Sequence, residues 1–107
     1  MEEEIKIPIG DKNYIYGILR GSLEKPLVIF VHGFTGYKNE HQFFNAARFF
    51  EKKNFSAFRF DLYSWKEDAR KLEKCTLSLH GQDLDTVVEY FRNQGVKKIF
   101  VAGHSFG

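Results

Sequence analysis

Apolar residues recur with two different periods along the chain, and the alternation of these periods predicts a mixed α/β domain. The segments 4–10 and 13–21 place apolar residues near every second position and are separated by a turn, which predicts an antiparallel hairpin. Residues 27–31 form an unbroken apolar run after Pro26, which is typical of a central strand buried on both faces. We therefore expect the domain to open with three strands.

A helix is predicted next. Asn39 can cap its first turn, with Gln42 three residues later, and apolar residues then recur at intervals of three and four. This predicted buried face consists of Phe43, Ala46, Ala47 and Phe50. Asn54 is expected to close the helix.

The following apolar run is expected to form a fourth strand that ends at Asp61. In a strand, successive side chains point to opposite faces. Phe58 and Phe60 should therefore lie on one side of the sheet, and Ala57 and Arg59 on the other.

The charged segment 63–74 shows no clear period, and we expect at most a short exposed helix there. A second long helix follows, with a predicted buried face of Leu84, Val87, Val88 and Phe91. Its predicted solvent side consists of Asp83, Asp85, Glu89 and Arg92. Gly95 is a natural stop for this helix, and 96–103 should form the last strand.

Strands that alternate with helices over short connections predict a mostly parallel sheet, because parallel neighbours need crossovers, which are right-handed. The antiparallel opening hairpin is the exception. At 107 residues the chain has room for one domain, residues 1–107.

Composition and charge exclude several classes of protein. With 43% hydrophobic residues, 12 Phe and 5 Tyr, the chain is too apolar for a disordered segment. The net charge of +2 comes from scattered residues, so the chain is not expected to bind nucleic acid. Cys75 is the one cysteine, which excludes an internal disulfide and suits a reducing compartment.

The sequence shows no sign of a membrane or metal-binding protein. It starts with acidic residues where a secretory signal would be basic, and no apolar run is long enough for a membrane span. A cytoplasmic protein is therefore expected. The histidines lack the spacing of a metal site, so we expect neither a metal nor a cofactor.

The sequence ends with GHSFG, residues 103–107, which fits the pattern G-x-S-x-G directly after a predicted strand. In that setting a sharp turn lifts the serine above the edge of the sheet, where it can act as a nucleophile. The turn strains the backbone of Ser105, and side chains at Gly103 or Gly107 would collide with the neighbouring strand or helix. An ordinary glycine-rich turn is the alternative interpretation.

A second unusual loop, HGFTG at residues 32–36, also follows a buried strand directly. In the strand order 1-2-4-3-5 this strand lies beside the one that ends at Ala102. Backbone NH groups of Phe34 and Phe106 could then converge near Ser105 Oγ and bind the oxyanion of a tetrahedral intermediate. A phosphate-binding turn is the alternative, but the chain contains neither G-x-G-x-x-G nor G-x-x-x-x-G-K-[ST].

From Lys25 to Gly107, these motifs and their order resemble the α/β-hydrolase superfamily, and more narrowly its serine aminopeptidase-like branch of esterases, lipases and thioesterases. The resemblance implies that Ser105 is the nucleophile and that Phe34 and Phe106 supply the oxyanion-hole NH groups. It further implies supporting roles at His32, Gly33, Gly103, His104 and Gly107.

The resemblance also implies a missing part. In this family the triad follows the chain order Ser, then Asp or Glu, then His. Nothing follows Gly107 in this sequence. We therefore expect the N-terminal part of an α/β-hydrolase fold, an incomplete domain truncated at the nucleophile elbow.

Two functional interpretations follow. As a member of its family, the protein would cleave a small-molecule carboxylic ester, thioester or small amide through an acyl-enzyme on Ser105, while the 107-residue chain alone would be inactive. Alternatively, it is a non-catalytic fragment or pseudoenzyme. In either case the exposed edge beside Ala102 favours self-association or a complementing C-terminal chain.

Other polar residues receive structural interpretations. His32 is a candidate base, but a hydrogen bond to the loop backbone that holds the Phe34 NH is favoured. His104 is expected to point away from the serine. A solvated or capping role is expected for His41 and His80.

The sequence departs from the family pattern at the rim of the expected pocket. Asp61 ends a strand at the functional edge, where it either forms a turn or lines the pocket. Relatives usually continue after this Asp with a glycine-rich loop, whereas LYSWKEDARK follows here, so the shape of the rim should differ. Phe106 and Tyr37 are expected to line an apolar acyl pocket.

Overall fold

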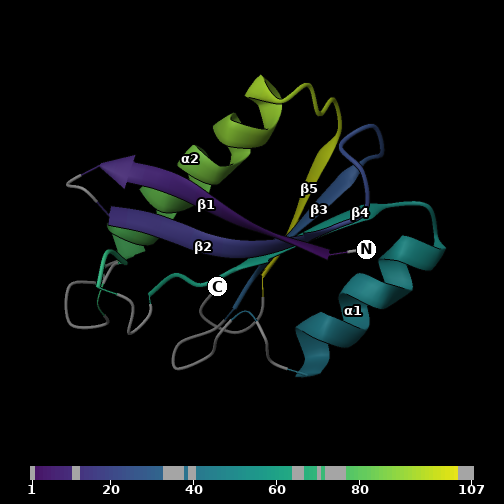
Figure 1. Cartoon of the computed structure of the whole chain (residues 1–107), viewed down its shortest axis with the longest axis horizontal. Helices are drawn as coiled ribbons and strands as arrows, with labels where there is room; N and C mark the ends of the chain where they lie inside the picture. Colours follow the sequence, from purple (N-terminus) through teal and green to yellow (C-terminus); the bar gives the residue numbers. More distant parts are fainter. Residues whose placement is uncertain are drawn as a thin grey trace.

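The computed structural model describes residues 2–10, 13–32, 38, 41–63, 67–69, 71 and 77–103, with the side chains of His41, Phe44 and Leu77 left out. Five strands and two helices follow one another along the chain (Figure 1). They are β1 (Glu2–Gly10), β2 (Asn13–Arg20), β3 (Leu27–Val31), α1 (His41–Lys52), β4 (Ser56–Phe60), α2 (Leu77–Asn93) and β5 (Ile99–Gly103). All seven were expected from the hydrophobic pattern. The cap expected at Asn39 lies outside the described residues.

The strands form one sheet in the order β1-β2-β4-β3-β5, which confirms the expected order. The β1–β2 hairpin is antiparallel, and β2 also pairs antiparallel with β4. The strand β3 pairs parallel with both β4 and β5. The sheet is therefore mixed, with its parallel part in the region that carries the two motif loops.

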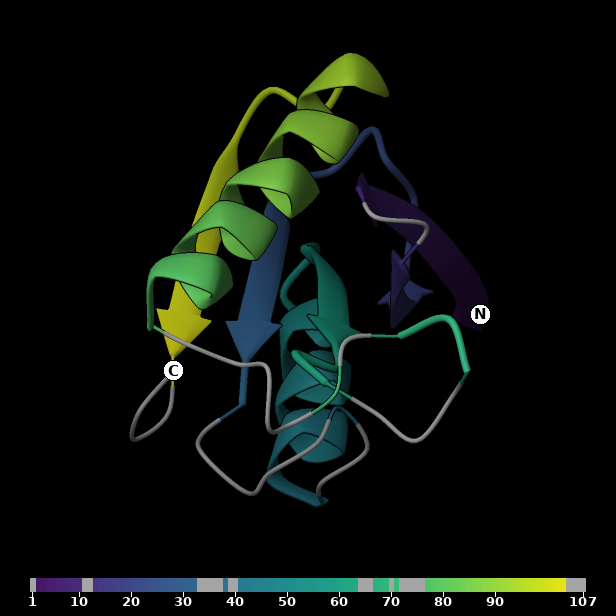
Figure 2. The same ribbon diagram turned by 90° about the vertical axis from the view of Figure 1, so that its left-hand side faces the viewer.

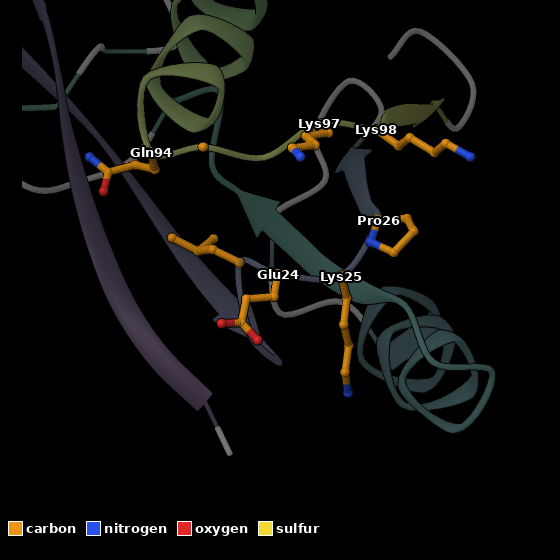
Figure 3. A pocket seen from close by; sticks show the side chains of 8 residues that line it. Glu24, Lys25, Pro26, Gln94, Lys97 and Lys98 are labelled. Carbon is orange, nitrogen blue, oxygen red and sulfur yellow. The ribbon is translucent and has the colours of Figure 1, made fainter.

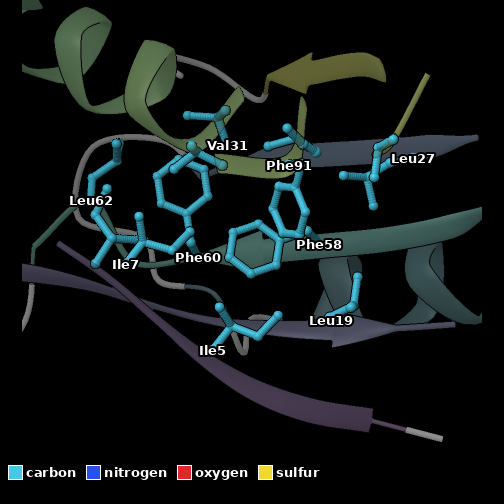
Figure 4. Packing of buried hydrophobic residues seen from close by; sticks show 13 residues of the cluster. Ile5, Ile7, Leu19, Leu27, Val31, Phe58, Phe60, Leu62 and Phe91 are labelled. Atoms are coloured by element: carbon cyan, nitrogen blue, oxygen red, sulfur yellow. The ribbon is translucent and has the colours of Figure 1, made fainter. Parts of the chain in front are cut away.

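The two helices cover opposite faces of the sheet (Figures 1 and 2). On the α2 face, Phe58 packs against Phe91 with ring centroids 4.8 Å apart and stacks on Phe60 at 5.9 Å (Figure 4). On the α1 face, Ala57 belongs to a second buried cluster with Phe30 and other residues of β3 and α1. The predicted alternation along β4 is confirmed, and both helices bury apolar faces that the sequence predicted.

Gly17 lets β2 and β4 lie against each other beneath Phe58. A Cβ at position 17 would lie 2.6 Å from Phe58 Cε1 and 2.9 Å from the backbone oxygen of Arg59. A side chain there must displace the ring or the backbone. Glycine at this strand position thus serves close packing.

Both helices end at residues with positive φ, as expected. Asn54 follows α1 with φ of 70°, and Gly95 follows α2 with φ of 94°. This left-handed conformation reverses the chain after a helix and is tolerated best by glycine and asparagine.

Asp83 corrects the predicted faces of α2. Asp85, Glu89 and Arg92 are exposed as predicted, but Asp83 is only 2% exposed. The core-facing stripe of α2 runs through Val87 and Phe91, both fully buried, and Asp83 lies one turn before Val87 on that stripe. Assigning every charged residue of the helix to solvent was therefore wrong at this position.

An ionic network ties α1 to the hairpin. Arg20 Nε lies 2.8 Å from Glu51 Oε1, and Arg20 Nη1 lies 2.9 Å from Glu2 Oε2. The buried Arg59 reaches the same Glu2 oxygen at 3.2 Å. Partial burial works to raise the pKa of Glu2, but Arg59 and Arg20 outweigh it and hold that pKa below its usual value.

A short segment after β4 docks on the hairpin. Tyr14 forms a bridge with Ala69, and Tyr16 Oη donates a 2.6 Å hydrogen bond to Asp68 Oδ1. The hydrogen bond from Tyr16 and the ammonium group of Lys6 hold the pKa of Asp68 below its usual value. In the segment 63–74, residues 63, 67–69 and 71 are described, and none of them is helical. The rest of this segment, where a short exposed helix was expected, lies outside the described residues.

Candidate active site

The two motif loops begin side by side at the carboxyl edge of the parallel strands. Val31 is in register with Phe60 on one side and with Gly103 on the other. Figure 2 shows β3 and β5 ending at the same edge. The adjacency of the two strands was expected from the strand order, and it places Gly103 beside Val31, the residue before His32.

Most of the motif residues lie outside the described residues. Of the candidate site residues, His32 and Gly103 are described, and Gly103 is the last residue of β5. Those outside are Gly33, Phe34, Tyr37, His104, Ser105, Phe106 and Gly107. The nucleophile, the two oxyanion donors and the lining of the acyl pocket thus remain predictions.

His32 is engaged in a hydrogen bond to the backbone. Its side chain is 1% exposed, and its Nε2 accepts a 2.9 Å hydrogen bond from the NH of Leu62. The ring also contacts the Tyr63 ring edge-on, with centroids 5.3 Å apart. An Nε2 that accepts from an NH group carries no proton, so the imidazole is neutral, and this lone pair is not available to a serine.

The bond made by His32 is of the expected kind, but its partner belongs to another loop. The sequence analysis favoured a hydrogen bond within the loop after β3. The structure shows a bond to the segment after β4, thirty residues away, and the expected partner, the loop of residues 33–37, lies outside the described residues. No local sequence pattern identifies such a partner.

Asp61 forms an ion pair with Lys38, a residue that the sequence analysis did not single out. The NH of Lys38 donates to Asp61 Oδ1 at 2.7 Å, and Lys38 Nζ donates to Asp61 Oδ2 at 2.8 Å. Each side chain is 10% exposed. The carboxylate of Asp61 therefore holds both the backbone and the side chain of Lys38.

The first part of α2 carries two polar residues that the sequence analysis assigned to solvent. Asp83 is buried, and His80, one turn earlier, is partly buried. The start of α2 lies toward the carboxyl end of β5 (Figure 2). Asp83 lies one turn before Val87 and His80 lies two turns before it, and this spacing was the signal that could have identified them.

An open cavity of about 510 Å³ lies at the opposite edge of the sheet (Figure 3). It is lined by Leu23, Glu24, Lys25, Pro26, Gln94, Gly95, Lys97 and Lys98. These residues precede β3 and β5 instead of following them. Ligands of open α/β sheets bind beyond the carboxyl ends of the strands, so this cavity is not the candidate active site.

Within the described residues, no group of three or more His, Cys, Asp or Glu side chains is arranged to hold a metal ion. Of the helices in the described part of the chain, none combines the length and apolar character needed to cross a membrane.

Neither a protein-family model nor a curated protein matches this sequence. Solved structures do match. Est1E from Butyrivibrio proteoclasticus, in a structure with ferulic acid bound, is 27% identical over 96% of this chain and 43% of its own, with a TM-score of 0.85. The esterase Pf2001 from Pyrococcus furiosus is 22% identical over 100% of this chain and 43% of its own, with a TM-score of 0.83.

A third similar structure is described as an α/β hydrolase, GrgF from Penicillium sp. sh18. It is 18% identical over 100% of this chain and 38% of its own, with a TM-score of 0.86. The chain therefore has the N-terminal part of the α/β-hydrolase fold, as the sequence predicted. It spans less than half the length of these similar structures.

Proposed function

We propose that the protein is a serine hydrolase of the α/β-hydrolase type that cleaves a carboxylic ester, thioester or small amide through an acyl-enzyme on Ser105. The observation that carries the proposal is the register of Val31 with Gly103, because it starts the HGFTG and GHSFG loops side by side at the carboxyl edge. The similarity to Est1E, whose structure has ferulic acid bound, and to the esterase Pf2001 supports the same class of reaction.

The proposed reaction uses a nucleophile and two backbone donors. Ser105 Oγ attacks the carbonyl carbon, and its proton passes to a general base. The NH groups of Phe34 and Phe106 bind the oxyanion of the tetrahedral intermediate. The intermediate collapses to the acyl-enzyme as the base passes its proton to the leaving alcohol, thiol or amine. Water then attacks the acyl-enzyme, and the free acid leaves Ser105. The reaction needs no metal or redox cofactor.

The base and the carboxylate that orients it are proposed to come from sequence outside these 107 residues. The family's chain order places both after the serine. His32, the alternative base, is occupied by the Leu62 NH. In this proposal His32, Gly33, Gly103, His104 and Gly107 support the two loops and take no proton.

Covalent labelling by a fluorophosphonate tests the proposal. It is done on the intact protein, by which we mean these 107 residues together with the segment that supplies the base and the carboxylate. The probe should form a phosphonyl ester at Ser105, located by mass spectrometry of the labelled peptide, because an activated serine reacts far faster than an ordinary hydroxyl group. Ser105→Ala should abolish labelling. Ser78→Ala, which alters an exposed serine of α2, is the control and should label like the wild type. Labelling at another residue, or labelling that survives Ser105→Ala, would contradict the proposal.

A specific observation favours the second interpretation, a non-catalytic chain that associates with another chain. In β5, Phe100 is 51% exposed and Val101 is 49% exposed. Among the described strands, β5 is the edge strand beyond β3. An exposed apolar edge strand is prone to pair with another polypeptide. Association of either kind, with a second copy or with a complementing chain, would cover this edge.

We expect the 107-residue polypeptide to self-associate through β5 at micromolar concentrations. Replacing both exposed residues, Phe100→Ser with Val101→Thr, should shift sedimentation toward the monomer. Phe49→Ser alters a residue of α1 that is 55% exposed and serves as the control, with no shift expected. A wild-type polypeptide that sediments as a single monomeric species would contradict this expectation.

A further inference from the structure

The loop of residues 33–37 is flanked by two described residues, and both contact the segment that follows β4. On one side, His32 Nε2 accepts the NH of Leu62 at 2.9 Å. On the other side, the NH of Lys38 donates to Asp61 Oδ1 at 2.7 Å, and its Nζ donates to Oδ2 at 2.8 Å. Asp61 and Leu62 are consecutive. The two residues that flank 33–37 are thus bonded to two consecutive residues, His32 to the backbone NH of Leu62 and Lys38 to the carboxylate of Asp61.

We propose that the Lys38–Asp61 pair is a positioning device for the loop that carries the Phe34 oxyanion donor. This inference rests on the proposed function for its catalytic consequence. In this proposal both act through the loop and not on the substrate, so both are positioning residues.

The pair is built to hold a fixed geometry. Both side chains are 10% exposed, so water competes little for their hydrogen bonds. Both carboxylate oxygens of Asp61 are used, one by a backbone NH and one by an ammonium group. Charge-assisted hydrogen bonds of this kind are about twice as strong as neutral ones.

Asp61 is itself tied to the sheet. Its own NH donates to the carbonyl oxygen of Tyr16 at 3.0 Å, beside the pairing of β2 with β4. The preceding residue, Phe60, is fully buried and in register with Val31. The carboxylate therefore extends from a rigid strand end, and Lys38 is held relative to the sheet and not merely to a neighbouring loop.

The position of an oxyanion donor matters more to the transition state than to the bound substrate. Removing one such donor lowers kcat by roughly 10²- to 10³-fold. A donor that is present but held less firmly should lower kcat by a smaller factor than a donor that is removed. Loosening the end of the loop at Lys38 should therefore lower kcat and leave KM nearly unchanged.

Amide hydrogen exchange of the 107-residue polypeptide tests the device without any need for catalysis. Asp61→Asn should raise the exchange rates of Lys38 and residues 33–37 by about tenfold or more, since local opening becomes easier. Lys38→Met keeps the backbone hydrogen bond to Asp61, so it should raise the same exchange rates less, by about threefold. Amides of Phe58 and Phe91 should keep their wild-type rates and report an intact core.

Glu51→Gln is the matched control. It weakens the Arg20–Glu51 pair, which has the same 2.8 Å separation but lies at the end of α1. Loop amides should keep their wild-type rates in this variant. If Asp61→Asn unfolds the core, Lys38→Met decides the question. Unchanged loop exchange in every variant with an intact core, or an equal rise in Glu51→Gln, would overturn the proposal.

Kinetics of the intact protein separate this inference from the proposed function. If Ser105 is labelled, Asp61→Asn should lower kcat for an ester by about 10- to 100-fold at nearly constant KM, below the full loss of a donor. A change in KM alone would contradict a positioning role. If the wild type does not label at Ser105, the proposed function fails, whereas the exchange experiment still tests whether the Lys38–Asp61 pair positions the loop.

Discussion

The 107-residue polypeptide by itself is expected to hydrolyse an activated acetate ester about a millionfold more slowly than the same polypeptide joined to a segment that supplies the histidine and the carboxylate. The physical reason is that the proposed function puts the proton acceptor outside these 107 residues, and a neutral serine hydroxyl is a weak nucleophile. His32 does not replace that acceptor, since its Nε2 accepts the Leu62 NH. What remains is binding and the contribution of the oxyanion hole.

The measurement compares the initial rates of the lone polypeptide and of a fusion to the C-terminal remainder of Est1E, which shares 27% identity with it. The lone polypeptide should show the same slow rate as its own Ser105→Ala variant. Rapid turnover by the lone polypeptide, with the pH profile of a titrating imidazole, would show that a group within the 107 residues acts as the base. His32→Gln would then identify whether that base is His32.

Phe58→Ala is expected to lower the free energy of unfolding by about 3–5 kcal/mol, the usual cost of emptying a fully buried aromatic site. Phe58 is fully buried, contacts Phe60 and Phe91, and covers Gly17. The loss is a large part of the stability of a domain of this size, about 5–15 kcal/mol.

Urea denaturation followed by circular dichroism gives this free energy. Phe49→Ala is the control, because that ring is 55% exposed on α1, and we expect a change of about 0.5 kcal/mol or less there. A loss below about 1 kcal/mol in Phe58→Ala would show that the core does not depend on this ring.

The regular elements could be predicted because each has a hydrophobic period that depends on few neighbours. An apolar run such as 27–31 reads as a buried strand, and all five of its residues are buried. The faces of β4 followed from simple alternation, and Asn54 and Gly95 identified the ends of the helices. Strand order was predicted as well, and it placed the strand that ends at Val31 beside the last strand.

The polar part of the site was predicted less well. Asp83 was assigned to solvent because charged residues usually are, although it lies on the stripe that Val87 and Phe91 define. Asp61 was taken for a turn or pocket residue, and its partner Lys38 precedes it by 23 positions. The bond of His32 to the Leu62 NH joins two segments thirty residues apart and was not predicted. In each case the deciding contact depends on how distant segments meet.

The sequence alone determined which segments become strands and helices, which residues form the two apolar clusters, and that two glycine-containing loops follow adjacent strands. Those properties come from local periodicity and from the steric needs of turns. Tertiary structure decided that Leu62 is a hydrogen-bond partner of His32, that Asp61 forms an ion pair with Lys38, and that Asp83 is buried. A buried polar group must find its partner wherever packing brings one, and no local pattern encodes that meeting.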